Sequence, residues 1–273
     1  MFKNQYKTWA LGLALAGVCV SANGTTLLDN NFDGNNGNDV GGTMSDLNNA
    51  KPVVPDGTDA STGVINFNDD VAGAVPAYGF ISGSAFDVSG APGFTVTWSV
   101  SGADTLNTGG IRANGWFFGV QSDNADLWNQ NSDALGVTFF TSNYATGARP
   151  EDVPALFASS GSTEVGTSLG IPIPTGAELA DGFELSLTLN SDDTWSVTST
   201  GLLTDINASG NLGFTALTYA DLASSLYVST ILQSDGALQD VQYDQVTLQT
   251  VPEPTSLALL ALGGLFMSRR RRG

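Results

Sequence analysis

The sequence contains no histidine, and Cys19 is its only cysteine. Without histidine the chain cannot build a Ser-His-Asp or Cys-His nucleophilic centre, a histidine-ligated zinc site or a histidine pH switch. A single cysteine forms no internal disulfide and no cysteine-based metal cluster. These two absences exclude several common catalytic and metal-binding chemistries before any motif is considered.

Charged residues are also scarce, at 13% of the 273 residues, and most of them are acidic. Between residues 23 and 250 the basic side chains are Lys51, Arg112 and Arg149, against 26 acidic residues, which gives this region a formal net charge of −23. Such a charge repels nucleic acids and anionic lipid surfaces, so we expect neither as a partner. It keeps an exported protein soluble, and it can attract divalent cations.

Residues 1–22, MFKNQYKTWALGLALAGVCVSA, have the layout of a secretory signal peptide. Two lysines precede an apolar run over residues 9–20, and small residues follow, so signal peptidase is expected to cut after Ala22. The residues before Cys19 are Ala-Gly-Val, which departs from a lipobox because no leucine stands three positions before the cysteine. We therefore expect export without lipidation.

The C-terminal segment, residues 251–273, reads VPEPTSLALLALGGLFMSRRRRG. An apolar run over residues 257–267 is followed by an arginine cluster, which is typical of a short membrane segment with a cytoplasmic basic end. As a helix, residues 255–268 would span about 21 Å, which is short against a hydrocarbon core of about 30 Å. A span of this length favours a transient stop-transfer segment in the inner membrane over a permanent anchor.

Polar motifs flank this apolar run on both sides. They are Pro252, Glu253 and Pro254 before it and Arg269, Arg270, Arg271 and Arg272 after it. In this order the three features resemble the PEP-CTERM sorting signal of Gram-negative bacteria that make exopolysaccharide. The resemblance implies recognition by an exosortase, an integral-membrane cysteine protease-transpeptidase, with cleavage near Pro252–Pro254 and delivery to the cell surface or extracellular matrix. It implies no catalytic activity for the rest of the chain.

The remainder, residues 23–250, is predicted to form one β-rich domain. Apolar and polar residues alternate over residues 94–100 and in a hairpin of 183–189 with 194–199, which predicts strands with one buried face. Over residues 241–248 the alternation changes phase, which predicts a β-bulge near Asp244 and Gln245. Further strands are predicted at residues 25–32, 64–67, 77–81, 115–121, 135–140 and 226–232. Only residues 217–225 are predicted to form a helix.

Short strands separated by Gly/Asn/Asp/Ser-rich turns favour an all-β, antiparallel β-sandwich. No segment repeats at a fixed period, so a propeller or solenoid is not expected. Four segments, LLDNNFDG, GWFFGVQ, GFELSLTLNSDDTWSV and YDQVTL, follow in an order that is similar to concanavalin-like (laminin-G-like) jelly rolls. Trp98, Trp116 and Trp195 stand in alternating strands and are predicted to lie in the core.

One loop has the composition of a glycan-binding site. Trp128 stands between polar residues in the segment 121–130, where Asp123, Asn124 and Asp126 supply carboxylate and amide groups. Sugars bind by stacking on exposed aromatic rings, with polar groups nearby for their hydroxyls. Flanking loops are predicted to add Arg112, Asn114 and Tyr144. The alternative is that Trp128 caps one end of the core.

A calcium site is a second candidate. Asp29, Asn31 and Asp33 stand at alternate positions before a glycine, which fits the D-x-N-x-D-G start of a calcium loop. The twelfth position is Val40 instead of a bidentate glutamate, and a strand end followed by a polar turn explains the same residues. Both interpretations stay open, as does a Ca²⁺ site elsewhere in the acidic domain.

An enzymatic role has less support. Glycoside hydrolysis needs two positioned carboxylates, and the E-x-D-x-x-E pattern of jelly-roll glucanases is absent. The glutamates before the tail are isolated in the sequence, and the first three fall in predicted loops: Glu151, Glu164, Glu178 and Glu184. Four prolines punctuate residues 148–182, which are predicted as a long connection with few strands, either a lid or an insertion.

The sequence thus predicts a secreted, acidic, non-catalytic β-sandwich that associates with exopolysaccharide. It would act either as a lectin-like binding module or as a structural matrix protein, with a divergent jelly-roll glycoside hydrolase as the alternative.

Overall fold

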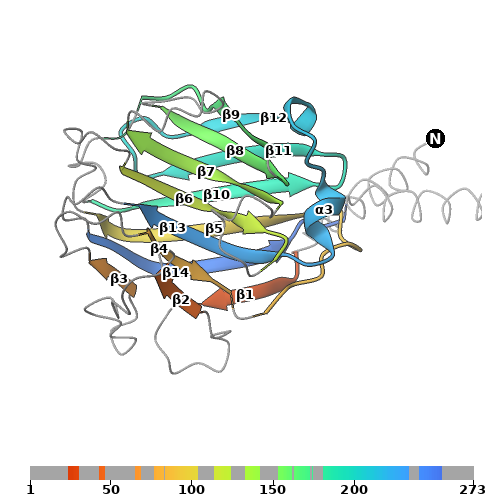
Figure 1. Cartoon of the computed structure of the whole chain (residues 1–273), viewed down its shortest axis with the longest axis horizontal. Coiled ribbons are helices and arrows are strands. Elements are labelled where there is room, and N and C mark those ends of the chain that lie inside the picture. Colours follow the sequence, from red (N-terminus) through yellow and green to blue (C-terminus); the bar gives the residue numbers. More distant parts are fainter. Residues whose placement is uncertain are drawn as a thin grey trace, which may run out of the picture. The chain divides into compact units, whose positions relative to one another are not determined.

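Two antiparallel β-sheets contain nearly all of the regular secondary structure in the described chain (Figure 1). The structure, a computed structural model, describes residues 24–30, 43–46, 65–68, 77–82, 84–103, 114–123, 133–141, 153–161, 163–172, 174, 181–233 and 240–253. Thr25–Val251 form one compact unit. The prediction of an all-β antiparallel sandwich is confirmed.

Sheet A is built on the strands whose alternation is clearest in the sequence. Its order is β1 (Thr26–Asn30), β14 (Asp240–Thr250), β5 (Gly93–Ala103), β10 (Phe183–Asn190), β11 (Thr194–Thr200) and β12 (Asn207–Asn211), with β3 (Ile65–Asn68) also paired to β14. One face of β5 and β10 is buried, at Phe94, Val96 and Trp98 and at the apolar positions of β10 opposite them. The predicted hairpin of β10 with β11 is confirmed.

Sheet B lies over the buried face of sheet A. Its order is β2 (Thr43–Asp46), β4 (Ala77–Ile81), β13 (Tyr227–Gln233), β6 (Asn114–Gln121), β7 (Ala134–Thr141), β8 (Pro154–Ser160) and β9 (Thr163–Ser168). Aromatic rings join the two sheets: Phe118 of sheet B packs edge-on against Trp98, at 5.9 Å between ring centroids, and against Phe183, at 6.0 Å. Trp98 and Trp195 are buried in the core, as predicted.

The outer face of sheet B is buried as well. Phe117 and Phe157 point away from the core yet are only 2% and 3% exposed, and their rings contact each other edge-on at 5.9 Å. Gly119 and Gly136 make room for Phe117, because a Cβ on either glycine would overlap its ring. The central strands of sheet B are therefore packed on both faces.

Two local predictions are confirmed. The register between β14 and β5 shifts between Gln242 and Gln245, where the bulge was predicted. The predicted helix is the short α3 (Tyr219–Ala223), preceded by a single 3₁₀ turn, η3 (Leu212–Phe214).

The prediction for residues 148–182 was wrong, because this region contains β8 and β9. Strand β8 is almost entirely buried on both faces, so its sequence, PALFASS, does not alternate between apolar and polar residues. The period-two pattern used to predict strands is therefore absent there. Pro154 is its first residue, a position where a strand tolerates proline. Glu164 lies on β9 and not in a loop. Strands β2 and β12 were also missed, and β12 (NASGN) offers no apolar residue larger than alanine.

Candidate functional site

The segment that joins β6 to β7 leaves and re-enters sheet B at the end of the sandwich that carries α3. Tyr227 begins β13 just after α3 and pairs with Gln121, the last residue of β6. Gln121 pairs in turn with Ala134, the first residue of β7. We call this end of the sandwich the α3 end. It comprises α3, the β10–β11 turn and the adjoining ends of β6 and β7.

Three hydrogen bonds fix the base of this segment. The backbone N–H of Ser122 donates to the carbonyl of Asp133 at 2.9 Å, which closes the two ends together. The side-chain amide of Gln121, fully buried, donates to the carbonyl of Asp123 at 2.7 Å. On the other side, the Asp133 carboxylate accepts a 3.2 Å hydrogen bond from the backbone N–H of Gly161. The loop base is thus tied to sheet B and to the neighbouring β8–β9 turn.

Gly161 has a backbone geometry that suits a tight turn. Its φ is +56°, in the left-handed region that favours glycine. Its carbonyl accepts a hydrogen bond from the hydroxyl of Ser159 at 3.3 Å, so the turn is held from both sides. The turn therefore presents its N–H to Asp133 in a fixed position.

The pairing register places a row of polar side chains beside the loop base. The row crosses the outer face of sheet B through Tyr227, Gln121, Ala134, Ser159 and Glu164. Gln121, Ala134 and Ser159 in this row are buried, and the side chains of Gln121 and Ser159 hydrogen-bond the carbonyls of Asp123 and Gly161. Tyr227 and Glu164, at the two ends of the row, are partly exposed and offer a phenol and a carboxylate to a ligand.

Of the predicted glycan-binding residues, the structure describes Asp123, which is partly buried at the start of the loop. Asn124, Asp126 and Trp128 lie outside the described residues, so their placement stays a prediction. The same holds for Arg112 and Tyr144 on the flanking segments. The prediction for Asn114 was wrong: it begins β6 instead of lying in a loop. The side chain of Trp116 is outside the described set.

Of the three predicted calcium ligands, the structure describes Asp29. Asp29 lies on β1, and its carboxylate accepts a 2.6 Å hydrogen bond from the side-chain amide of Gln245. Asn31 and Asp33 lie outside the described residues. Within the part of the chain that the structure describes, no three His, Cys, Asp or Glu side chains form a group that could hold a metal ion.

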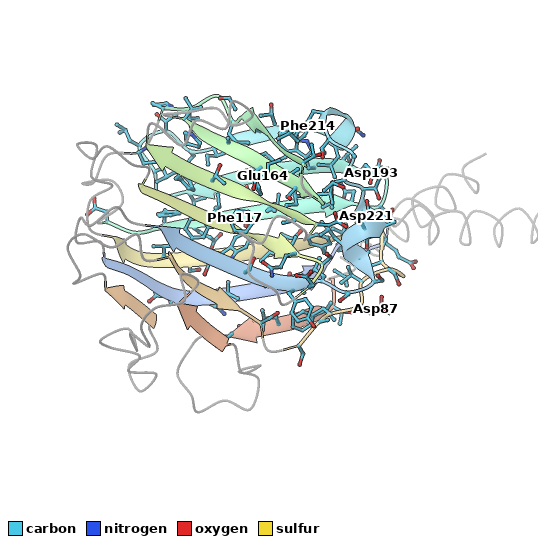
Figure 2. The ribbon with its side chains drawn as sticks, in the orientation of Figure 1. Asp87, Phe117, Glu164, Asp193, Phe214 and Asp221 are labelled. Carbon is cyan, nitrogen blue, oxygen red and sulfur yellow. The ribbon has the colours of Figure 1, made fainter. Side chains whose placement is uncertain are left out.

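Acidic residues gather at the α3 end, where Figure 2 shows Asp87, Asp193 and Asp221. The Asp87 carboxylate accepts hydrogen bonds from the hydroxyl of Ser89 at 2.6 Å and from its backbone N–H at 3.0 Å, and these bonds hold the pKa of Asp87 below its ordinary value. Asp192 has a lowered pKa for the same reason, with Thr194 as its partner. These carboxylates stabilise local turns.

The other two acids position α3. Asp193, at φ +63°, accepts a 2.6 Å hydrogen bond from the backbone N–H of Tyr219, and Asp221 accepts from the backbone N–H and hydroxyl of Thr218. Tyr219 donates its hydroxyl to the carbonyls of Val88 and Ala91. Burial and then the charge of Asp87 raise the pKa of Tyr219. The cluster is explained by capping, and sequence reasoning missed this role.

The two ends of the compact unit lie together at this same end of sheet A. The backbone N–H of Thr250 donates to the carbonyl of Thr25, and the Thr25 N–H donates to the Thr250 hydroxyl, both at 2.9 Å. Pro252 and Glu253 follow directly and are exposed. Ala22, Pro254 and Arg269–272 lie outside the described residues. Among the residues that are described, no helix is long and apolar enough to cross a membrane.

Comparison with solved structures defines the class of the fold. The chain is similar to the winged bean acidic lectin solved with methyl-α-D-galactose, at 12% identity and a TM-score of 0.50, over 78% of this chain and 93% of the lectin. It also matches the lectin from Bauhinia forficata solved with GalNAc (7% identity, TM-score 0.49, 78% and 99% covered). A third match is the legume lectin-like domain from Entamoeba histolytica (10% identity, TM-score 0.46, 77% and 90% covered). The fold is a lectin-like jelly roll, which confirms the predicted resemblance.

The C-terminal tail is assigned more specifically. Residues 250–272 match the model of the PEP-CTERM protein-sorting motif, so the second resemblance is also confirmed. The motif indicates that the chain is exported and sorted through its C-terminal tail. No curated protein matches the chain.

Proposed function

We propose that this protein is an exported, non-catalytic, lectin-like module that binds a glycan through the loop between β6 and β7. The observation that carries the proposal is the anchoring of that loop: Gln121, Ser122 and Asp133 fix its base on strands that are packed on both faces. A binding loop on a rigid base loses little conformational entropy when it binds.

The chemistry of the loop suits sugar hydroxyls. Trp128 would stack on the apolar face of a sugar ring, while Asp123, Asn124 and Asp126 would accept and donate hydrogen bonds. The partner we propose is the exopolysaccharide or another surface glycan. Ca²⁺, if it takes part, would be held by oxygen ligands such as Asp29, Asn31 and Asp33.

Export and sorting would proceed in two cuts. Signal peptidase would remove residues 1–22. An exosortase would cleave near residues 252–254 after residues 255–268 have held the chain transiently in the inner membrane. The product would be a sandwich domain of residues 23–250 at the cell surface or in the extracellular matrix. The Thr25–Thr250 pairing supports this, because both cuts would fall within a few residues of an ordered strand.

A glycan screen of residues 23–250, run with calcium and with a chelator, tests the binding proposal. We expect selective binding that is lost in Trp128→Ala and retained in Leu203→Ala, because Leu203 is an 87% exposed apolar residue in the β11–β12 connection at the opposite end. Absence of binding in both conditions would contradict the lectin-like role and favour a structural matrix protein. Release of reducing ends from a bound glycan would instead indicate a hydrolase.

Mass spectrometry of the exported protein tests the sorting proposal. The mature chain should begin after Ala22 and lack the residues beyond about Pro254. Retention of Arg269, Arg270, Arg271 and Arg272 on the surface form would contradict it.

A further inference from the structure

The last strand of the sandwich ends where the sorting motif begins. Strand β14 runs to Thr250, and Val251 is the next residue and still hydrogen-bonds to sheet A. The matched motif covers residues 250–272, and Pro252 and Glu253 are exposed. No linker therefore separates the folded domain from the proposed cleavage site.

The end of β14 is hydrogen-bonded on both sides. The backbone N–H of Thr250 donates to the carbonyl of Thr25 at 2.9 Å, and the N–H of Val251 donates to the carbonyl of Gly93 at 2.8 Å. In return, the N–H of Thr25 donates to the hydroxyl of Thr250 at 2.9 Å. Since β14 lies between β1 and β5, neighbours on both sides hold its end. We call these three hydrogen bonds the β14 clasp.

The acceptor of the clasp on β5 is itself held in place. Gly93 pairs with Asn190 on β10, and the carbonyl of Pro92 beside it accepts a 2.8 Å hydrogen bond from the N–H of Ser191. Two residues before the clasp, the side chain of Leu248 is fully buried in the core. The clasp can therefore open by detachment of the last two residues, 250 and 251, while the rest of the sheet stays paired.

The clasp and a processing enzyme compete for the same backbone groups. An enzyme that binds a peptide as an extended strand hydrogen-bonds its N–H and C=O groups. A cut near residues 252–254 places Thr250 and Val251 just before the scissile bond, and the N–H groups of both residues are already used within sheet A. The enzyme gains them only when this end of the strand opens locally.

We propose that the β14 clasp limits processing of the tail: the exosortase cleaves the folded chain only while Thr250 and Val251 are detached from Thr25 and Gly93. The inference rests on the proposed sorting by an exosortase. In the cut, the carbonyl carbon before the scissile bond forms a thioester with the exosortase cysteine, and the nitrogen after it takes the thiol proton and leaves with the tail. Water or an acceptor nucleophile then releases the thioester. When opening is fast, the rate of cleavage follows the fraction of chains with an open clasp.

Pulse-chase labelling of the full-length precursor, in a Gram-negative host that makes an exosortase, tests the proposal. The test variant carries Gly-Ser-Gly-Ser-Thr-Val inserted after Val251. This insert leaves the clasp closed, keeps Thr-Val before Pro252 and does not change the distance from the motif to residues 255–268. The matched control carries the same insert after Leu203, an exposed position in the β11–β12 connection.

A second variant weakens the clasp without touching the motif. Thr25→Pro removes the N–H that donates to the hydroxyl of Thr250. Thr25 directly precedes β1, a position that tolerates proline, so the variant should fold.

We expect the insert after Val251 to speed loss of the tail about tenfold or more, because the wild-type chain must first break three hydrogen bonds. Thr25→Pro should give a smaller increase, and the insert after Leu203 should be processed at the wild-type rate. Equal rates for wild type, Thr25→Pro and the insert after Val251 would overturn the proposal.

A fusion of residues 250–273 to an unrelated carrier through a flexible linker separates this inference from the sorting proposal. If the fusion is processed but the insert after Val251 gives no increase, the clasp has no role and sorting stands. If the fusion keeps its tail, the sorting proposal fails, and the inference fails with it.

Discussion

The outer faces of the two sheets differ sharply. Sheet A turns half-exposed hydroxyls outward, while the central strands of sheet B turn outward side chains that are as buried as the core, among them Phe117, Phe157 and Ser229. Sheet A is thus an ordinary two-sided antiparallel sheet with one solvated face. Sheet B is packed on both sides where it carries the proposed binding loop. Sheet B, which carries the loop, is therefore the more rigid of the two sheets, and mutations on its outer face should cost more stability than mutations on the outer face of sheet A.

The largest effect is expected for Phe117→Ala. This change empties the space over Gly119 and Gly136 and removes the edge-on contact with Phe157, so it should lower the free energy of unfolding by about 3–5 kcal/mol. Urea unfolding of residues 23–250 measures this loss of free energy. Thr97→Val tests the outer face of sheet A in the same way and should cost much less. If it lowers the free energy of unfolding as much as Phe117→Ala, the two outer faces do not differ in packing.

Gly136→Ala should come next, at about 1–3 kcal/mol, because the new methyl group would overlap the Phe117 ring and the carbonyl of Phe118. Gly90 lies in a turn, and a methyl group added there would meet no atom within 4 Å, so Gly90→Ala serves as the control in the same thermal unfolding series. If both glycines tolerate alanine equally, the outer face of sheet B is not closely packed.

Alanine substitutions at two serines should change the free energy of unfolding differently. Ser186 pairs its hydroxyl with Thr97, so Ser186→Ala should destabilise by about 0.5–1.5 kcal/mol. The hydroxyl of Ser229 is buried and finds no hydrogen-bond partner among the residues that the structure describes, so Ser229→Ala should be neutral or stabilising by up to about 1 kcal/mol. Chemical denaturation of the two variants checks this, and a large loss in Ser229→Ala would show that its hydroxyl is satisfied in solution.

The smallest effect concerns acid stability of the β10–β11 turn. Hydrogen bonds from Thr194 lower the pKa of Asp192, so its folded form binds its proton less readily than the unfolded chain. The stabilisation is present above the ordinary value of 3.8 and is lost as pH falls through the lowered folded pKa. In Asp192→Asn the unfolding midpoint should depend slightly less on pH below about pH 4. An unchanged pH slope would contradict this role for the turn.

The same contrast explains how far the sequence predicts the structure. Strands with one solvated face, such as β5, β10 and β11, alternate visibly, so they were predicted with the correct buried positions. Strand β8 is buried on both sides and loses that signal, and β12 is polar throughout. The pairing register of the strands depends on contacts between distant segments, which no local sequence pattern encodes. The row from Tyr227 to Glu164 and the hydrogen bond between Asp133 and Gly161 both depend on this register. The contact of Asp193 with Tyr219 was missed for the same reason. The capping box of Thr218 and Asp221 is a local pattern three residues apart, which sequence reasoning could have found.

Hydrogen exchange of residues 23–250, with and without a soluble glycan selected in the screen, would locate the binding site. We expect the glycan to slow amide exchange in residues 122–133 and in the β8–β9 turn that Asp133 holds, with little change on β10, β11 and β12. Slowing confined to sheet A, or no slowing with any glycan, would contradict a binding site at the β6–β7 loop.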